Sequence, residues 1–369
     1  MSKYPMVRLE DVCDKATSSI AQKDLKNLEG IYPIYGAGGF IKNVNFYKQD
    51  REYIAIVKDG AGIGRAMILP AFSSVIGTMQ YILPKDNIIT KYLYFAIDSM
   101  NLAKYFTGAT IPHIYFKDYK NESLPLPPIE HQRSIIKILE SIVSLIIKRK
   151  QQLSKFDELA KSRFIEMFGQ CGEDRFGWGV SKLGDYCIIN PSKSTEARLE
   201  DELEVSFCPM PYVSESGDIK TDETKLYKDV KSGFTYFAED DVLFAKITPC
   251  MENGKGAIAR NLKNGIGFGS TEFHILRPNR SIITPEWLYV LTTFKQFRKD
   301  AEANMTGSAG QKRVPSIFLR NYKISIPPLE LQKQYVGILE QLDKSKFRIK
   351  KSLEKLEMTY KALLQEYFG

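Results

Sequence analysis

The sequence predicts a mixed α/β (α+β) fold in which two globular domains are separated by two long antiparallel helices that form a coiled coil with approximate two-fold symmetry. Three observations lead to this prediction. A chain of 369 residues, 43% of them hydrophobic, exceeds what one core usually organises. Residues 124–169 recur as residues 324–369. Both copies carry apolar residues at heptad spacing, whereas the segments before them are rich in short strand-like runs.

The repeat begins with LPLPPIEHQ (124–132) and ISIPPLELQ (324–332). Residues 124–169 align on residues 324–369 without a gap at a constant offset of 200, and 14 of the 46 aligned positions are identical. A period this long indicates a duplicated module rather than a solenoid of short units.

Each copy is predicted to begin a helix directly after its Pro-Pro pair. Proline fixes φ and holds the preceding residue extended, and Glu130 or Glu330 then lies in the first turn, where the helix dipole favours an acid. Gly169 and Gly369 stand where a glycine ends a helix. About 39 residues at 1.5 Å each would make a rod of about 58 Å.

Heptad positions along both helices predict that they pair with each other. Arg149, Arg163 and Lys346 are charged interruptions of this pattern, which otherwise continues over about five heptads. The alternative is that each amphipathic helix packs only on its own domain. The expected seam consists of Ile135, Leu139, Ile142, Ile146, Leu153, Phe156, Tyr335, Leu339, Leu342, Ile349, Leu353 and Leu356.

The connectivity predicts the direction of the two helices. The intervening segment must leave the C-terminal end of the first helix and return to the N-terminal end of the second. If that segment is a compact domain, the two ends are neighbours and the helices are antiparallel. The expected division is a globular domain at residues 1–123, a helical spacer at 124–169, a second globular domain at 170–323 and a second spacer at 324–369.

The two globular segments resemble each other at their starts and ends but not in their middles. VRLEDVC (7–13) matches SKLGDYC (181–187), and both segments end in a P-x-I-x-x-x-x-Y-K pattern. The middles alternate β-branched and aromatic runs with glycine, which predicts strand-rich domains with functional loops. Single helices are expected near residues 90–100 and 285–300. One scaffold with two interiors predicts two domains that read different ligands.

Composition argues against several classes of protein. The N-terminus has no apolar signal core, and the most apolar stretch is broken by Lys137 and Glu140, so we expect a soluble, cytoplasmic chain without a membrane span. The five cysteines form no C-x-x-C pair. That pattern argues against a disulfide framework and against a zinc site, and favours free thiols.

The charge distribution points to a phosphate-binding surface in the second domain. Residues 173–241 contain 8 basic and 16 acidic residues, whereas residues 242–323 contain 13 and 5. Basic side chains hold phosphates, and polar side chains read base edges. For each candidate the alternative is a solvated basic face. The candidate DNA-binding residues are Lys58, Arg65, Thr110, His113, Lys246, Thr248, Asn253, Lys255, Ser270, Thr271, Gln311, Lys312 and Arg313.

Catalytic motifs are missing from the sequence. It holds no G-x-x-x-x-G-K-[ST] phosphate loop, and its three histidines are too scattered to suggest a metal site. The segment DGAGIGR (59–65) has G-x-G-x-G spacing without a following helix pattern, which favours a tight turn or DNA-facing loop over a dinucleotide site. NPSK (190–193) lacks the second proline and the aromatic residue of an amino-methyltransferase motif. The chain is predicted to bind and position, not to catalyse.

With its twin P-P-x-E-x-Q helices, the sequence resembles the specificity subunit of Type I restriction-modification systems. The resemblance covers essentially the whole chain. Within the globular segments it includes YPIYGAGG (32–39), DVLFAKITPCMENGKG (241–256) and GFGSTEFHILRP (267–278).

The resemblance implies that each globular segment is a target-recognition domain for one half of a bipartite double-stranded DNA target. The helices would be spacers that hold the two readers about one DNA turn (~34 Å) apart. Two methyltransferase subunits would dock on this frame and methylate adenine with S-adenosylmethionine, and two restriction-translocase subunits could join them. No cofactor is expected in this chain.

Other classes of function remain open at this point. The chain could serve a methyltransferase-only or Type II system of the same architecture. A free-standing methyltransferase or nuclease would act on DNA alone. A scaffold unconcerned with DNA would show no salt-dependent DNA binding, whereas a phosphate-neutralising reader should lose affinity steeply as salt rises.

Overall fold

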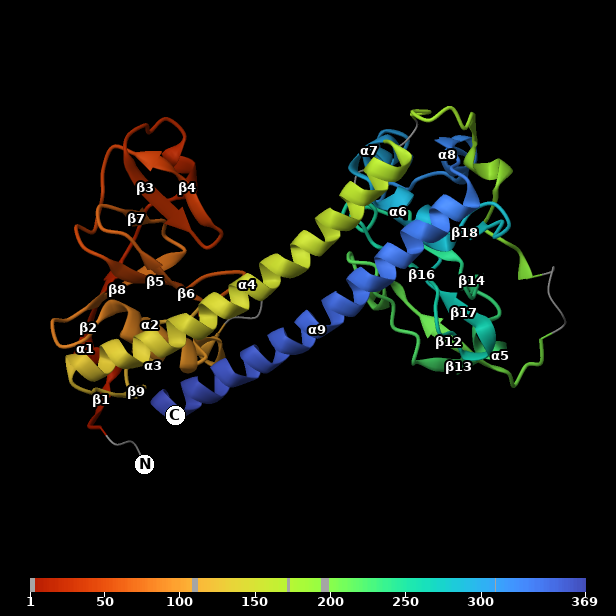
Figure 1. Cartoon of the computed structure of the whole chain (residues 1–369). Coiled ribbons are helices and arrows are strands. Elements are labelled where there is room, and N and C mark those ends of the chain that lie inside the picture. The colour runs from red at the N-terminus through yellow and green to blue at the C-terminus, as the bar shows by residue number, and fades with distance from the viewer. Residues whose placement is uncertain (1–3, 108–111, 171–172, 194–198, 309) are drawn as a thin grey trace. The chain divides into compact units, whose positions relative to one another are not determined.

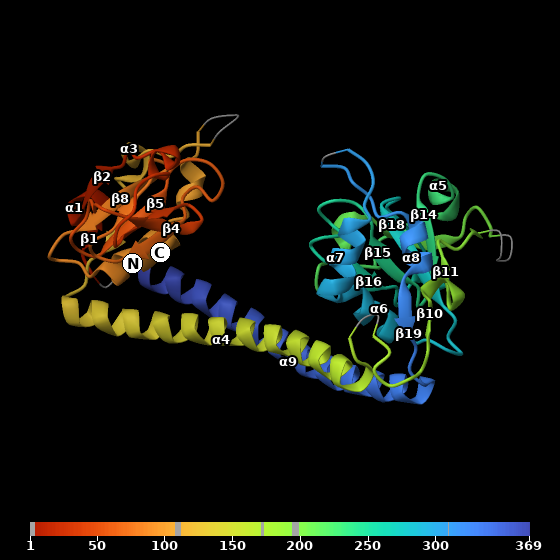
Figure 2. The same cartoon turned by 90° about the horizontal axis from the view of Figure 1, so that it is seen from above.

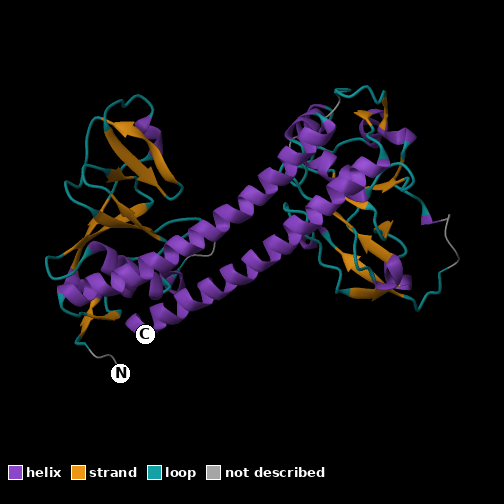
Figure 3. Ribbon diagram, in the orientation of Figure 1, coloured by secondary structure: helices purple, strands orange, loops and turns teal. Residues whose placement is uncertain are grey.

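The computed structural model describes residues 4–107, 112–170, 173–193, 199–308 and 310–369. The chain divides into two compact units. Unit 1 comprises Met1–Gln151 and Ile349–Gly369, and unit 2 comprises Gln152–Arg348. Each unit therefore contains one globular segment and part of each long helix. Both globular segments combine strands, short helices and loops (Figure 3). The four-part division expected from the sequence remains a prediction.

The two long helices are α4, Ile129–Phe168, and α9, Leu329–Phe368, each of 40 residues. Both begin directly after a Pro-Pro pair and end one residue before a glycine, as the repeat predicts. Gly169 has φ +82°, a left-handed conformation that favours glycine, so this residue ends α4 for a steric reason.

Within unit 2 the two helices are antiparallel. The hydroxyl of Tyr335 donates a hydrogen bond of 3.0 Å to the carbonyl oxygen of Ala160. Further on in α9, Lys346 Nζ lies 2.7 Å from Asp157 Oδ1. Partner numbers fall along α4 as they rise along α9, which confirms the predicted antiparallel pairing for this unit.

Within unit 1 the pairing has the same direction. Lys150 Nζ lies 2.9 Å from Glu357 Oε1. Nearer the start of α4, Leu139 shares a core cluster with Leu364 and Phe368, from the last turns of α9. The helix segments of this unit lie side by side in both views (Figure 1, Figure 2).

The described residues of the globular part of unit 1 form two sheets of three or four strands and a two-stranded pair. The first has the antiparallel order β2 (Cys13–Thr17), β8 (Met79–Pro84), β5 (Tyr53–Val57), β6 (Ala66–Leu69). The second has the order β4 (Gly39–Val44), β3 (Tyr32–Gly36), β7 (Ser74–Val75), with β3 and β7 parallel. β1 (Met6–Arg8) pairs with β9 (Ser123–Pro125), and the helices are α1 (Leu9–Val12), α2 (Thr90–Ser99) and α3 (Phe116–Tyr119), with 3-10 turns at Gln22–Leu25 and Leu102–Tyr105.

The globular part of unit 2 repeats this plan. Its first sheet has the order β11 (Cys187–Ile189), β18 (Phe273–Pro278), β15 (Val242–Ala245), β16 (Gly256–Ile258). Its second has the order β13 (Thr224–Leu226), β12 (Glu204–Cys208), β17 (Ile266–Gly269), β14 (Thr235–Ala238). β10 (Val180–Lys182) pairs with β19 (Lys323–Ser325), and the helices are α5 (Tyr227–Val230), α6 (Pro285–Thr293), α7 (Lys295–Ala303) and α8 (Ser316–Asn321), with 3-10 turns at Leu183–Asp185, Met210–Tyr212 and Lys263–Gly265.

The two units share one topology although their middles share no sequence pattern. The order β2-β8-β5-β6 in unit 1 corresponds to β11-β18-β15-β16 in unit 2. Each second sheet is built around one parallel pair, β3 with β7 and β12 with β17. β14 is an addition in unit 2. The central strands β5, β15 and β17 are buried along their whole length, so the cores determine the sheets while the side chains in the loops differ.

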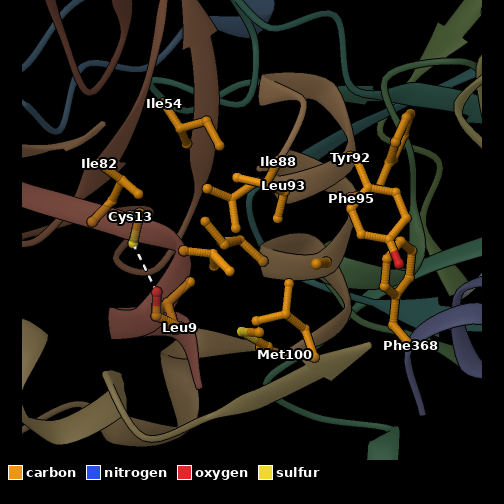
Figure 4. Close-up of a cluster of buried hydrophobic side chains, with 14 of the residues drawn as sticks. Leu9, Cys13, Ile54, Ile82, Ile88, Tyr92, Leu93, Phe95, Met100 and Phe368 are labelled. Carbon is orange, nitrogen blue, oxygen red and sulfur yellow. Dashed lines mark hydrogen bonds between the residues drawn. The ribbon is translucent and has the colours of Figure 1, made fainter. Parts of the chain in front are cut away.

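The ends of the long helices enter the globular cores. In unit 1, Tyr92 of α2 packs against Phe368 of α9 with ring centroids 5.1 Å apart (Figure 4). Nearby, the thiol of Cys13 donates to the carbonyl of Leu9 at 3.1 Å, and burial raises the pKa of this thiol to about 12. This cysteine is therefore a buried, unreactive thiol.

The burial of α4 and α9 can be compared with the expected heptad seam. All twelve expected seam residues are buried or half-buried. Arg163, a charged interruption of the heptad pattern, is exposed, whereas Phe164 and Phe168 are 2% and 4% exposed and pack into the core of unit 2. In a straight α-helix, positions seven residues apart do not stay on one side of the helix. At the C-terminal end of α4, the side that carries Phe164 and Phe168 faces the apolar core of unit 2.

The expected single helix at residues 285–300 is two helices, α6 and α7. Phe294 between them has ψ 138°, an extended conformation. Its ring lies 5.0 Å from that of Phe164, centroid to centroid. Phe294 packs on α4 at the break between α6 and α7. The helix propensities of the residues around Phe294 do not predict this break. The other expected helix, near residues 90–100, is confirmed as α2.

No helix in the described part of the chain combines the length and the apolar character needed to cross a lipid bilayer.

Candidate nucleic-acid interface

In unit 1 the candidate residues meet around the loop that joins β5 to β6. This loop, residues 58–65, contains Gly60, Gly62 and Gly64 at φ +83°, +83° and +81°. A Cβ on Gly64 would lie 2.6 Å from the backbone nitrogen of Ala103, so only glycine fits there. The G-x-G-x-G segment is therefore a tight hairpin loop followed by a strand, without the helix that a dinucleotide site requires.

Lys58 and His113 come together at the base of this loop. The backbone nitrogen of Ile114 donates to the carbonyl of Lys58 at 2.9 Å, which brings the segment before α3 against the hairpin. His113 Nδ1 then lies 2.6 Å from Asp59 Oδ1, and Lys58 Nζ lies 3.6 Å from Asp59 Oδ2.

The other two unit 1 candidates are placed differently. Arg65, at the far end of the hairpin loop, is exposed and donates from its guanidinium to the carbonyl of Ala37. Thr110 lies outside the described residues.

In unit 2 the candidates lie on three segments that converge. Lys246, Thr248, Asn253 and Lys255 are on the loop between β15 and β16, Ser270 and Thr271 follow β17, and Gln311, Lys312 and Arg313 precede α8. Backbone bonds join these segments. Val314 N donates to Lys246 O at 2.9 Å, Thr248 N donates to Lys312 O at 3.0 Å, and Lys246 N donates to Glu272 O at 2.9 Å. The structure thus assembles candidates that are separated in sequence.

Arg298, which was not among the candidates, holds the loop between β15 and β16 through hydrogen bonds to its backbone. This arginine of α7 is 8% exposed and donates to the carbonyls of Met251 at 2.8 Å and Gly254 at 3.3 Å. A third bond of 2.6 Å goes to the carbonyl of Thr292. Burial lowers the pKa of Arg298 to about 10, which still leaves it charged at neutral pH. Its spacing in sequence carries no signal of this role.

Acidic partners shape the electrostatics of the unit 2 cluster. Arg313 forms a two-bond contact with Glu272, which lowers the pKa of that carboxyl group. Burial lowers the pKa of Lys246. Burial also lowers the pKa of His274, whose Nε2 lies 2.7 Å from the carbonyl of Val314. Glu272 was not among the candidates, although it is one of only 5 acids in residues 242–323.

An open depression of about 360 Å³ adjoins this cluster in unit 2. Its walls include Asn190, Lys193, Tyr236, Lys246 and Phe273. Lysine ammonium groups beside aromatic faces and amides are the mixture that suits a phosphate-bearing, base-containing ligand.

Comparison with known proteins identifies the family. Residues 1–155 and 176–358 match the model of the type I restriction modification DNA specificity domain. The two matched segments follow the internal repeat, one for each globular segment and the helix after it.

Curated relatives agree with this match. The type I restriction enzyme EcoAI specificity subunit of Escherichia coli is 46% identical over 167 residues, and the EcoEI specificity subunit of the same species is 41% identical over 167 residues. These alignments cover 45% of this chain and only 28% of either relative. The MjaVIII specificity subunit of Methanocaldococcus jannaschii is 24% identical over 383 residues, covering 92% of this chain and 85% of that protein.

Two solved structures share the fold. The type I restriction-modification S subunit from M. genitalium superposes with a TM-score of 0.53 at 14% identity, covering 100% of this chain and 96% of that one. A chain from work on complex assembly and conformational transition of the type I R-M system gives a TM-score of 0.54 at 17% identity, covering 100% and 99%. The chain therefore belongs to the family of type I restriction modification DNA specificity domains.

Proposed function

We propose that this chain is the DNA sequence-recognition subunit of a Type I restriction-modification complex and is not catalytic by itself. Each unit would read one half of a bipartite target with the loops that follow β5 or β15 and precede α3 or α8. The observation that carries the proposal is the family match over both repeats, since it includes both sets of loops. The shared topology with different loop side chains supports two readers of different half-sites.

The partners in this proposal are double-stranded DNA and two methyltransferase subunits, which would dock along α4 and α9 and carry S-adenosylmethionine. Two restriction-translocase subunits would join for cleavage. The helices would set the unread gap between half-sites. The assembled complex would act on DNA in the cytoplasm.

A map of methylated adenines in the source organism, with and without this gene, tests the proposal. We expect one bipartite motif with an unread gap to disappear when the gene is deleted, and to return when it is restored on a plasmid. A control plasmid carrying a frameshift in the same gene should restore nothing. An unchanged map in all three strains would contradict the proposal.

DNA binding in vitro separates this function from that of a scaffold. The chain, copurified with its modification subunits, should bind a duplex carrying the mapped motif, with affinity that falls steeply between about 50 and 200 mM salt. The chain alone should transfer no methyl group and cut no DNA. Methylation or cleavage by the purified chain would instead favour a free-standing enzyme.

A further inference from the structure

We propose that Arg313 is a specificity-determining residue that reads a guanine, and that Glu272 positions its guanidinium. His113 occupies the equivalent place in unit 1 and reads a different base. This inference rests on the proposed function and deepens it. The pairing of these side chains with acids from neighbouring loops carries the argument.

Each nitrogen of the Arg313 guanidinium donates to a neighbouring protein group. Nε donates to Glu272 Oε2 at 2.9 Å, and Nη2 donates to Glu272 Oε1 at 2.7 Å. Nη1 donates to the carbonyl of Gln311 at 3.1 Å. A guanidinium has five N–H groups. One N–H on Nη1 and one on Nη2 therefore have no protein partner among the described residues.

Those two N–H groups suit a guanine in the major groove. Guanine presents two adjacent acceptors there, O6 and N7, and the end of an arginine fork matches both. The Arg313 side chain is 42% exposed, so a ligand can reach it. Lysine cannot replace this geometry, because its ammonium is a point charge without a fixed fork.

Because of Glu272, Arg313 is suited to distinguishing between bases more than to contacting phosphate. The two-bond contact fixes the plane of the guanidinium and reduces the conformational entropy lost on binding. The same carboxylate offsets the positive charge, which weakens attraction to any phosphate. An arginine held in this way adds less to general affinity than to the distinction between bases.

His113 lies at the same place in unit 1. The backbone of Thr107 pairs with that of His113, as the backbone of Thr306 pairs with that of Arg313. The next residue in each unit, Ile114 or Val314, donates its backbone N–H at 2.9 Å to the lysine that follows β5 or β15. Positions 113 and 313 are thus structurally equivalent.

The acid beside His113 comes from a different loop but acts in the same way. Asp59 Oδ1 lies 2.6 Å from Nδ1, and an ionised carboxylate only accepts, so Nδ1 carries a proton. One ring nitrogen, Nε2, is left for a base. A single ring nitrogen cannot make the two-donor contact of Arg313, so the two units should prefer different base pairs at this position.

The test is a base-by-base selectivity profile of Arg313→Lys. After the motif has been mapped, complexes of the chain with its modification subunits would bind a panel of duplexes with one base pair changed at a time. We expect R313K to lose about tenfold or more discrimination at one G·C pair of one half-site. Discrimination at the remaining pairs, the salt dependence and the thermal stability should be close to those of the parent, because the charge is kept.

Two further variants separate reading from packing. Glu272→Gln should weaken discrimination at the same pair and should have no further effect when combined with R313K. The control is Arg280→Lys, because Arg280 is an exposed arginine of the same unit that pairs with Asp240 and lies outside the cluster. This control should leave the whole profile unchanged. His113→Asn should alter only the other half-site.

The outcomes distinguish this inference from the proposed function. If no bipartite motif depends on the chain, the proposed function fails. If the motif exists but R313K keeps the full profile, or loses discrimination equally at all positions, Arg313 is only a structural tie and the inference is overturned. If Glu272→Gln still reduces discrimination between base pairs when it is added to R313K, Glu272 does not act through Arg313 and its proposed role is overturned.

Discussion

Gln132 and Gln332, which are 200 residues apart in the sequence, make the same three hydrogen bonds in their two units. The side-chain oxygen of Gln132 accepts from Ile89 N at 2.8 Å, and its nitrogen donates to Pro127 O at 2.9 Å and Asn87 O at 3.1 Å. Gln332 accepts from Thr284 N at 2.9 Å and donates to Pro327 O and Ile282 O, both at 2.8 Å.

These glutamines connect each long helix to the globular part that precedes it. Both are fully buried, and each bonds the segment that enters α2 or α6 to the residues just before its own helix. The motif P-P-x-E-x-Q therefore fixes the direction in which a helix leaves its globular part. Glu130 and Glu330 in the same motif are exposed. Their place in the first turn has only the modest effect of an acid at a helix start.

Replacing Gln332 with leucine should destabilise unit 2 by about 3 kcal/mol, because it leaves Thr284 N–H and two carbonyls buried without partners. Both tryptophans of the chain, Trp178 and Trp287, lie in unit 2, so denaturant unfolding followed by fluorescence reports on this unit. Glu330→Gln is the matched control and should change the unfolding free energy by less than about 0.5 kcal/mol. Equal effects of both variants would contradict this role.

Tyr335 supports the helix pair in unit 2 through both its ring and its hydroxyl. The ring packs on Phe164 and Phe168 with centroids 5.6 and 5.4 Å away, and the hydroxyl bonds Ala160 O. Tyr335→Phe should cost about 1 kcal/mol through the lost hydrogen bond, and Tyr335→Ala about 3–5 kcal/mol through the cavity. The same fluorescence experiment measures both. An alanine variant as stable as the phenylalanine variant would show that the ring contributes little.

Arg298→Met should loosen the loop between β15 and β16 while leaving the rest of unit 2 folded. The substitution removes the donors of Met251 O and Gly254 O but fills the same volume with an apolar side chain. Hydrogen–deuterium exchange should show faster exchange in peptides that cover residues 246–255 than in the parent. Arg260→Met, at an exposed arginine of the same unit, serves as control. Unchanged exchange in the loop would mean that Arg298 only fills the core.

His274 should make unit 2 less stable as pH falls. Its Nε2–H donates to Val314 O, and its Nδ1 accepts at 3.0 Å from Asn190 Nδ2. Asn190 Oδ1 lies 3.3 Å from the same Nδ1 and accepts from Ile275 N. Protonation of Nδ1 would remove the acceptor of the bond from Asn190 Nδ2. Burial and the Lys246 charge lower the pKa of His274 from 6.5, while Val314 O and Glu272 oppose this shift.

The sign follows from the lowered pKa. Below about pH 6.5 the unfolded chain takes up a proton that folded His274 does not, so the unfolding free energy should fall by up to about 1.4 kcal/mol per pH unit until the folded pKa is reached. Measurements at pH 7.5, 6.5 and 5.5 on the parent and on His274→Gln check this. The variant should lose that part of the pH dependence. Parallel curves for both proteins would exclude His274 as its source.

The long helices could be predicted from the sequence because their determinants are local. Pro-Pro pairs, an acid in the first turn, heptads and a terminal glycine act within a few residues, and α4 and α9 begin and end where these signals predict. The same local reasoning was wrong at Phe294, where packing on Phe164 accompanies a break. It also did not predict that Phe164 and Phe168 pack into the core of unit 2.

The candidate interface could be predicted only as a set of residue types. Lys246 and Arg313 were expected because they are basic residues near glycine turns. Glu272 was missed, because no sequence pattern predicts which acidic side chain will bond to the Arg313 guanidinium. Arg298 was missed for the same reason, because its three carbonyl partners are brought to it only by packing.

The sequence by itself determined the duplication and the two long helices, since repeat spacing and heptad periodicity need no knowledge of distant contacts. The direction of the helices followed from the connectivity, given a compact domain between them. Only the tertiary structure decided that the two dissimilar middles share one strand order, and that positions 113 and 313 are equivalent. Strand order depends on pairings between residues far apart in the chain, and the geometry of a side chain depends on which groups those pairings bring beside it.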